Sequence, residues 1–283
     1  MNTYTNIISF CIVTIFYFLV LKPKITYDIL TSATSITQYT KNNLLYLAIY
    51  FLLVVVLQFS LNTYFITTTC GGSIPQNMGT AGLMTFIPWL LIFGTILIIL
   101  IMYPGFKSAF SDVIGYYCVS GSASKILNEL LVDAEIYKEI EKSSEGDSTK
   151  LEALKSTASL VTKLTGNMSL LINKIVPTNF VEFWNLLKPL MKEQYKEGEN
   201  AISIRNKLLD LSSMRENIGE AMWYIYAGIV LISIVQYNIT SRGCINDLST
   251  MQKNYQNFQE KEENAKTTAD ASNANNTLYT ISN

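Results

Sequence analysis

Four cysteines are the residues with the most obvious chemistry in this chain. Cys11, Cys70, Cys118 and Cys244 are each isolated in the sequence, so they form no Cys-x-x-Cys pair of the kind that binds zinc or exchanges disulfides. The sequence also has no histidine, which removes the commonest general base and the commonest metal ligand. Two interpretations remain for the thiols: all four stay free, or two of them form a disulfide bond.

Other catalytic patterns are weak. Gly71 and Gly72 lack the following lysine that a phosphate-binding loop requires. Asp133 and Glu135 are two residues apart, and such positions do not share a face of a helix. We therefore expect no enzymatic activity, no cofactor and no metal site.

The composition indicates a membrane protein. Of the 283 residues, 49% are hydrophobic and only 15% are charged, and the mean hydropathy is +0.24; soluble domains usually carry about 25% charged residues. The net charge is −1, so no overall positive field favours nucleic acid, and we expect none as a partner.

Four apolar segments are predicted to span the bilayer, at residues 7–21, 44–61, 83–103 and 221–237. The first rises only about 22 Å as a helix, so Tyr4 and Lys22 are expected at the two interfaces. A cleaved signal peptide is the alternative for this segment. The predicted fold class is all-α, a polytopic membrane protein with four transmembrane helices and an extramembrane helical domain.

The connections predict the topology. Residues 1–61 hold the first two spans with a basic loop between them, 62–82 form an uncharged loop, 104–220 form a long polar region, and 238–283 form a polar, partly flexible tail. Basic residues are enriched on the cytoplasmic side of membranes. This rule places the basic loop and 104–220 on the inner face, and the uncharged loop and the tail on the outer face.

The inner domain is predicted to begin with a helix that lies in the membrane interface. Pro104 and Gly105 stop the third span. Apolar residues then recur at helical spacing, with polar residues opposite, and this stripe includes Phe106, Phe110, Ile114 and Tyr117. The alternative is that the stripe packs on the protein's own helices. At the end of the domain, one uninterrupted helix is expected from about Ala201 to Tyr237.

This topology places Cys70 and Cys244 on the same outer face. Cys11 lies within a span and Cys118 on the inner face, so Cys70 and Cys244 are the candidate disulfide if that face is oxidising. Free thiols remain the alternative.

The end of the third span also resembles integral membrane proteins of large nucleocytoplasmic DNA viruses, including giant viruses. The resemblance covers Gly82 to Leu131 and is carried by a span that closes on Pro-Gly-aromatic and by the residues after it: Pro104, Gly105, Phe106, Phe110, Ser111, Asp112, Gly115 and Tyr116. It implies a structural protein of the virion's internal membrane, beneath a capsid of double jelly-roll subunits.

The expected function is therefore to anchor the internal membrane of a virion, derived from host endomembrane, to capsid or minor capsid proteins. Expected partners are the lipid bilayer, those proteins and further copies of the chain. The alternatives are a component of a viral fusion or entry machinery, or a cellular endomembrane anchor that binds partner helices.

Overall fold

The computed structural model describes residues 3–131, 167–242, 244, 252 and 255–267. Within these ranges the chain is helical apart from short connections and an isolated β-bridge between Leu131 and Met191. Four helices among the described residues are long and apolar enough to cross a membrane. The all-α, four-span prediction is therefore confirmed.

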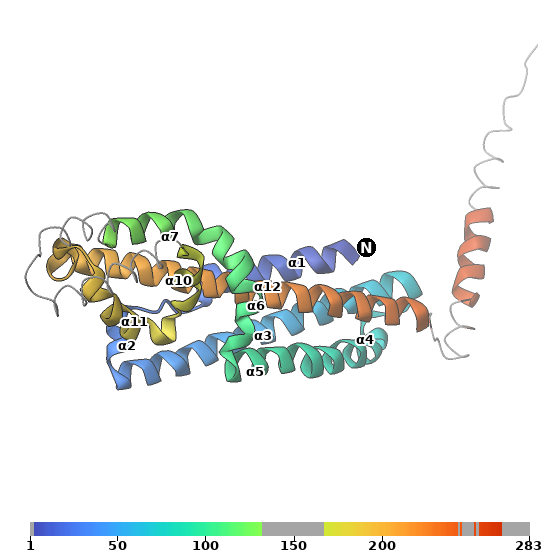
Figure 1. Ribbon diagram of the computed structural model, residues 1–283. Coiled ribbons are helices and arrows are strands. Elements are labelled where there is room, and N and C mark those ends of the chain that lie inside the picture. The colour runs from blue at the N-terminus through green and yellow to red at the C-terminus, as the bar shows by residue number, and fades with distance from the viewer. Residues whose placement is uncertain (1–2, 132–166, 243, 245–251, 253–254, 268–283) are drawn as a thin grey trace, which may run out of the picture.

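The four spans form an elongated bundle (Figure 1). The first consists of α1 (Thr3–Phe16) and a π-helical turn (Tyr17–Leu21), and the second is α3 (Ala33–Cys70). The third comprises α4 (Ile74–Pro88), a π-helical turn (Trp89–Phe93) and α5 (Gly94–Met102). The fourth is α12 (Gly198–Arg242), which contains 45 residues. The single helix expected from about Ala201 to Tyr237 is thus continuous, and α12 as a whole is about 67 Å long by the standard rise.

The uncharged outer loop expected at 62–82 is almost entirely helical, so this domain boundary is corrected. Helix α3 continues to Cys70 and α4 begins at Ile74. The turn between them uses positive φ angles at Gly71 (73°) and Gly72 (82°), which glycine adopts without steric cost. Asn62, the first residue of the predicted loop, is buried inside the bundle, where its side chain forms hydrogen bonds with other helices.

The basic loop between the first two spans is also structured. It contains α2 (Tyr27–Thr31), and the Ser32 side chain then accepts a hydrogen bond from the backbone amide of Ser35 to cap α3. Tyr27 lies under the guanidinium of Arg205, 3.5 Å from the ring centroid. This loop therefore belongs to the inner domain, which is wider than the 104–220 segment predicted.

The inner domain packs around the first half of α12 and is the end of the molecule that carries α7 (Tyr116–Leu130), α10 (Met168–Lys174) and α11 (Phe180–Leu187) (Figure 1). Its core is apolar and includes Val119, Leu127, Ile172, Phe180, Trp184 and Leu208. The part of the predicted domain at 132–166 lies outside the described residues. We call this end of the bundle the inner face and the opposite end the outer face.

A short segment joins the third span to α7. It comprises a 3₁₀ turn (Pro104–Lys107), α6 (Ser108–Phe110) and a π-helical turn (Ser111–Gly115). Figure 1 shows that this segment, which we call the crossing segment, runs across the bundle, whereas α5 and α7 follow its long axis. The chain turns where Pro104 cannot continue the backbone hydrogen bonds of α5.

Beyond α12, the described part of the tail includes a helix at residues 255–267. The flexibility expected of 238–283 concerns mainly residues outside the described ranges.

Candidate functional site at the membrane junction

The predicted interface stripe divides into two parts. Phe106 and Tyr117 are 53% and 82% exposed. Phe110 is not fully exposed, because its ring lies edge-on against Trp223, with 5.1 Å between ring centroids. Phe110 therefore packs on α12, as the second alternative expects, whereas the side chains of Phe106 and Tyr117 are largely exposed. Burial of these two side chains in the membrane interface stays a prediction.

The opposite face of the crossing segment packs closely on α12. A β-carbon added at Gly115 would lie 2.5 Å from the carbonyl oxygen of Arg215, and one added at Gly219 would lie 2.6 Å from the β-carbon of Ser111. Such distances mean that neither helix can carry a larger residue there without moving. Ser111 and Gly115, which carry part of the viral resemblance, are thus packing positions against the fourth span.

Glu220 is the centre of a buried ionic cluster where the spans meet the inner domain. Its Oε2 lies 3.0 Å from Nζ of Lys22 and 2.5 Å from Nζ of Lys107, and its Oε1 accepts a hydrogen bond of 2.7 Å from Tyr224. Lys22 follows the first span and Lys107 follows the third. Burial lowers the pKa of Lys22, and the charge of Glu220 opposes that shift. One carboxylate therefore joins three of the four spans.

Arg215, about one turn earlier in α12, extends the cluster into the inner domain. Its fully buried guanidinium donates to the carbonyl oxygen of Ile172 at 2.6 Å and to the side-chain oxygen of Asn173 at 3.1 Å. It also pairs with Glu216 at 2.9 Å and lies 3.7 Å from Asp112. These contacts fasten α10 and the crossing segment to α12.

The charges of this cluster balance. Three cations face three anions: Lys22, Lys107 and Arg215, and Asp112, Glu216 and Glu220. A buried charge without a partner costs several kcal/mol, whereas a paired and hydrogen-bonded one is tolerated. We call these six residues the charged junction. Its ion pairs link α12 to the ends of the first and third spans and to the crossing segment.

A second polar cluster joins all four spans near the outer face. The side chain of Asn62 accepts hydrogen bonds from Asn6 (3.0 Å) and Gln236 (2.7 Å), and donates one to Thr85 (2.9 Å). Gln58 donates to the backbone carbonyl of Asn6 at 3.1 Å. All five residues are buried. In an apolar bilayer such interhelical bonds hold helices together.

A layer of buried aromatic rings separates these two polar clusters. Phe10, Trp89 and Phe93 are fully buried, and the rings of Phe10 and Trp89 lie 5.6 Å apart. A β-carbon at Gly228 would overlap the Phe10 ring, so α1 and α12 are in intimate contact at this level. The middle of the bundle is therefore a packed core.

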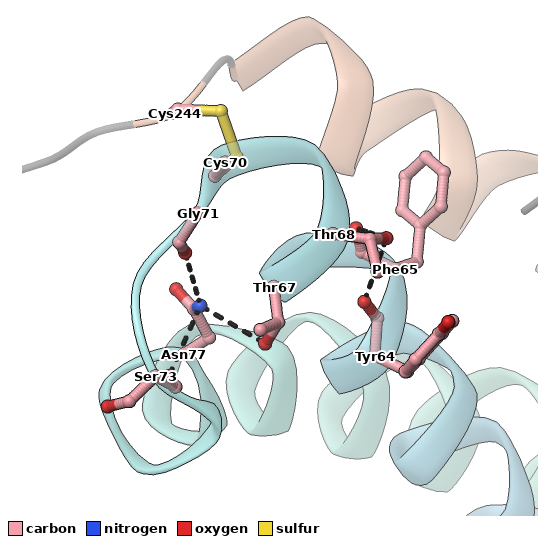
Figure 2. Close-up of a disulfide and its surroundings, with 9 residues drawn as sticks. All are labelled: Tyr64, Phe65, Thr67, Thr68, Cys70, Gly71, Ser73, Asn77 and Cys244. Atoms are coloured by element: carbon pink, nitrogen blue, oxygen red, sulfur yellow. Dashed lines mark hydrogen bonds between the residues drawn. A yellow bond between two sulfur atoms is a disulfide. The ribbon is translucent and has the colours of Figure 1, made fainter. Parts of the chain in front are cut away.

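The structure joins the two cysteines that the topology brings to one face. Cys70 ends α3 and Cys244 lies two residues beyond α12, and a disulfide links them with 5.1 Å between Cα atoms (Figure 2). Asn77 supports the adjacent turn by donating to Thr67 at 3.2 Å and to the carbonyl oxygen of Gly71 at 3.0 Å (Figure 2). Cys11 and Cys118 are free, and Cys118 is exposed.

Sequence reasoning missed the Asn62 cluster and the role of Arg215. The predicted second span ended at Leu61, one residue before Asn62. A usable signal was present: Gln58 and Asn62 are four residues apart, so they share a helix face. Arg215 carried no such signal, because a single arginine in a polar helix is usually solvated.

Comparison with protein-family models, curated proteins and solved structures finds no match to this chain.

Proposed function

We propose that this protein is a structural membrane anchor that holds a protein layer at a fixed position relative to a bilayer. One observation carries the proposal. Helix α12 is a single helix that both spans the bundle and forms part of the core of the inner domain. A partner bound to the inner domain would therefore be coupled to the membrane without a hinge.

The two ends of the fourth span are fastened in different ways, which supports this role. At the inner face the charged junction ties α12 to the first and third spans and to α10. At the outer face the disulfide ties Cys244, just beyond α12, to the end of α3. A support that transmits force needs such fastenings at both membrane surfaces.

The biological setting we propose is the internal membrane of a large DNA virus, derived from host endomembrane. The support is the resemblance around Pro104 to Tyr116, together with the packing role of Ser111 and Gly115. In this setting the inner domain binds capsid or minor capsid proteins, and several copies act together at the membrane surface.

Cross-linking of purified particles, read by mass spectrometry, tests the proposal. The inner domain has exposed lysines at Lys125, Lys188 and Lys207. We expect them to cross-link to shell proteins, and we expect many copies of the protein in each particle. Lys261 and Lys266, in the tail helix, are the matched controls, because the tail is expected on the opposite face.

Two results would contradict the anchor. The fusion or entry alternative would be favoured if each particle held few copies of the protein and antibodies against its outer face blocked infection. Absence of the protein from particles, with cross-links to cellular helices, would favour an endomembrane anchor.

A further inference from the structure

The crossing segment and the start of α7 carry an apolar surface that stays exposed in the part of the chain that the structure describes. Phe106, Val113 and Tyr117 are 53%, 66% and 82% exposed. They lie on the face opposite to Ser111 and Gly115, which are buried against α12. Three large apolar side chains so exposed on one short stretch need a covering that is not water.

The structure indicates what covers them. The exposed apolar surface of α5, which includes Ile98, Ile101 and Met102, runs directly into the crossing segment. Helix α5 belongs to a candidate membrane span, so its exposed residues contact lipid. The three residues continue that lipid-facing surface around the bend at Pro104, at the level where Lys107 enters the charged junction.

The segment is also held rigidly at this depth. The indole nitrogen of Trp223 donates to the carbonyl oxygen of Phe106 at 2.8 Å, and Lys107 pairs with Glu220. Because these contacts bind the segment to the fourth span, it cannot withdraw from the membrane surface without breaking the junction.

We propose that the crossing segment is a wedge in one leaflet, and that the protein therefore favours membranes that are convex on the side of the inner domain. An in-plane amphipathic segment adds cross-section to the leaflet it enters, and its binding is sensitive to curvature. On the outer face, α3 and α4 are joined by a turn of only Gly71–Ser73, so this connection between spans adds no such segment. Of these two connections between helices, the one on the inner face therefore adds cross-section and the α3–α4 turn on the outer face does not.

The experiment uses the full chain reconstituted into phosphatidylcholine vesicles of mixed diameter. Fluorescent labelling of exposed Cys118 with a membrane-impermeant reagent selects molecules whose inner domain points outward. Protein density per membrane area is then measured on single vesicles. For these molecules density should rise as diameter falls. Molecules of the opposite orientation are labelled after permeabilisation, and their density should decrease as vesicle diameter decreases.

The variant F106S/V113S/Y117S removes the apolar surface from side chains that are already exposed, and it should lose the dependence on diameter. Its matched control is L170S/L186S, which changes two residues of the inner domain that are 61% and 71% exposed. This control should keep the dependence of density on diameter. Should the triple variant fail to fold, Tyr117→Ser alone should reduce the slope. A flat profile for the unmodified chain, the same slope in both orientations, or an unchanged slope in the serine variants of this surface would overturn the proposal.

Discussion

Ser111 and Gly219 lie in direct contact: a β-carbon at Gly219 would come within 2.6 Å of that of Ser111. This contact is where the crossing segment meets the fourth span, one residue before Glu220. It explains why a glycine occupies the middle of a 45-residue helix, although glycine costs about 1 kcal/mol there relative to alanine. The close approach offsets that cost by bringing the junction's charges together.

Gly219→Ala is therefore expected to destabilise the protein. Overpacking costs about 1–3 kcal/mol, which outweighs the gain of about 1 kcal/mol in helix propensity. The free energy of unfolding in mild detergent measures the effect. Gly121→Ala is the control: no atom lies within 4 Å of its added β-carbon, so this variant should be as stable as the parent or more so. A stabilised Gly219→Ala variant would contradict the packing described.

Glu220→Gln should weaken the junction between the spans and the inner domain. The change leaves Lys22 and Lys107 without their shared carboxylate, and we expect a loss near the lower end of the about 3–5 kcal/mol typical of broken buried pairs. Amide exchange around residues 215–224 should accelerate. Glu193→Gln breaks the exposed pair with Lys196 and should cost about 0–1 kcal/mol.

A charge-restoring variant distinguishes electrostatics from packing. Lys107→Gln combined with Glu220→Gln leaves two cations facing two anions, so it should recover part of the stability lost by Glu220→Gln alone. Additive losses in this double-mutant cycle would show that the two residues do not interact.

Asn62→Leu should loosen the outer half of the bundle. Three interhelical hydrogen bonds are lost, to Asn6, Thr85 and Gln236, and at about 0.6 kcal/mol per bond in membrane proteins the loss is about 2 kcal/mol. Unfolding in detergent or bicelles measures it. Ser60→Ala is the control, because the exposed Ser60 hydroxyl donates to the carbonyl oxygen of Val56 in its own helix; an equal effect of both changes would argue against the Asn62 cluster.

The disulfide predicts a pattern of thiol labelling on sealed vesicles. Cys70 and Cys244 should react with an impermeant reagent only after reduction and from one side, and Cys118 should react without reduction from the other side. Labelling of Cys118 and Cys70 from the same side would overturn the topology. Cys70→Ser with Cys244→Ser should lower stability by at most about 4–5 kcal/mol, the chain-entropy value for a long loop, because insertion in the membrane already restricts the unfolded chain.

The membrane class, the four spans and the uninterrupted fourth helix could all be predicted from the amino-acid sequence. These features follow from the length and hydrophobicity of local runs of sequence. In a bilayer the backbone amides and carbonyls must bond within the segment, and an α-helix satisfies them all. The topology also narrowed the candidate disulfide to Cys70 and Cys244, since the sidedness of a cysteine follows from counting spans.

Which polar residues act together became visible only in the packed bundle. Glu220 meets Lys22 and Lys107 across separations of 198 and 113 residues, and no local pattern encodes such a meeting. The same holds for Asn62 and for the stripe after Pro104, where Phe110 contacts Trp223 and Phe106 and Tyr117 stay exposed. Periodicity defines a face of a helix, but the neighbour that the face contacts depends on how the helices pack.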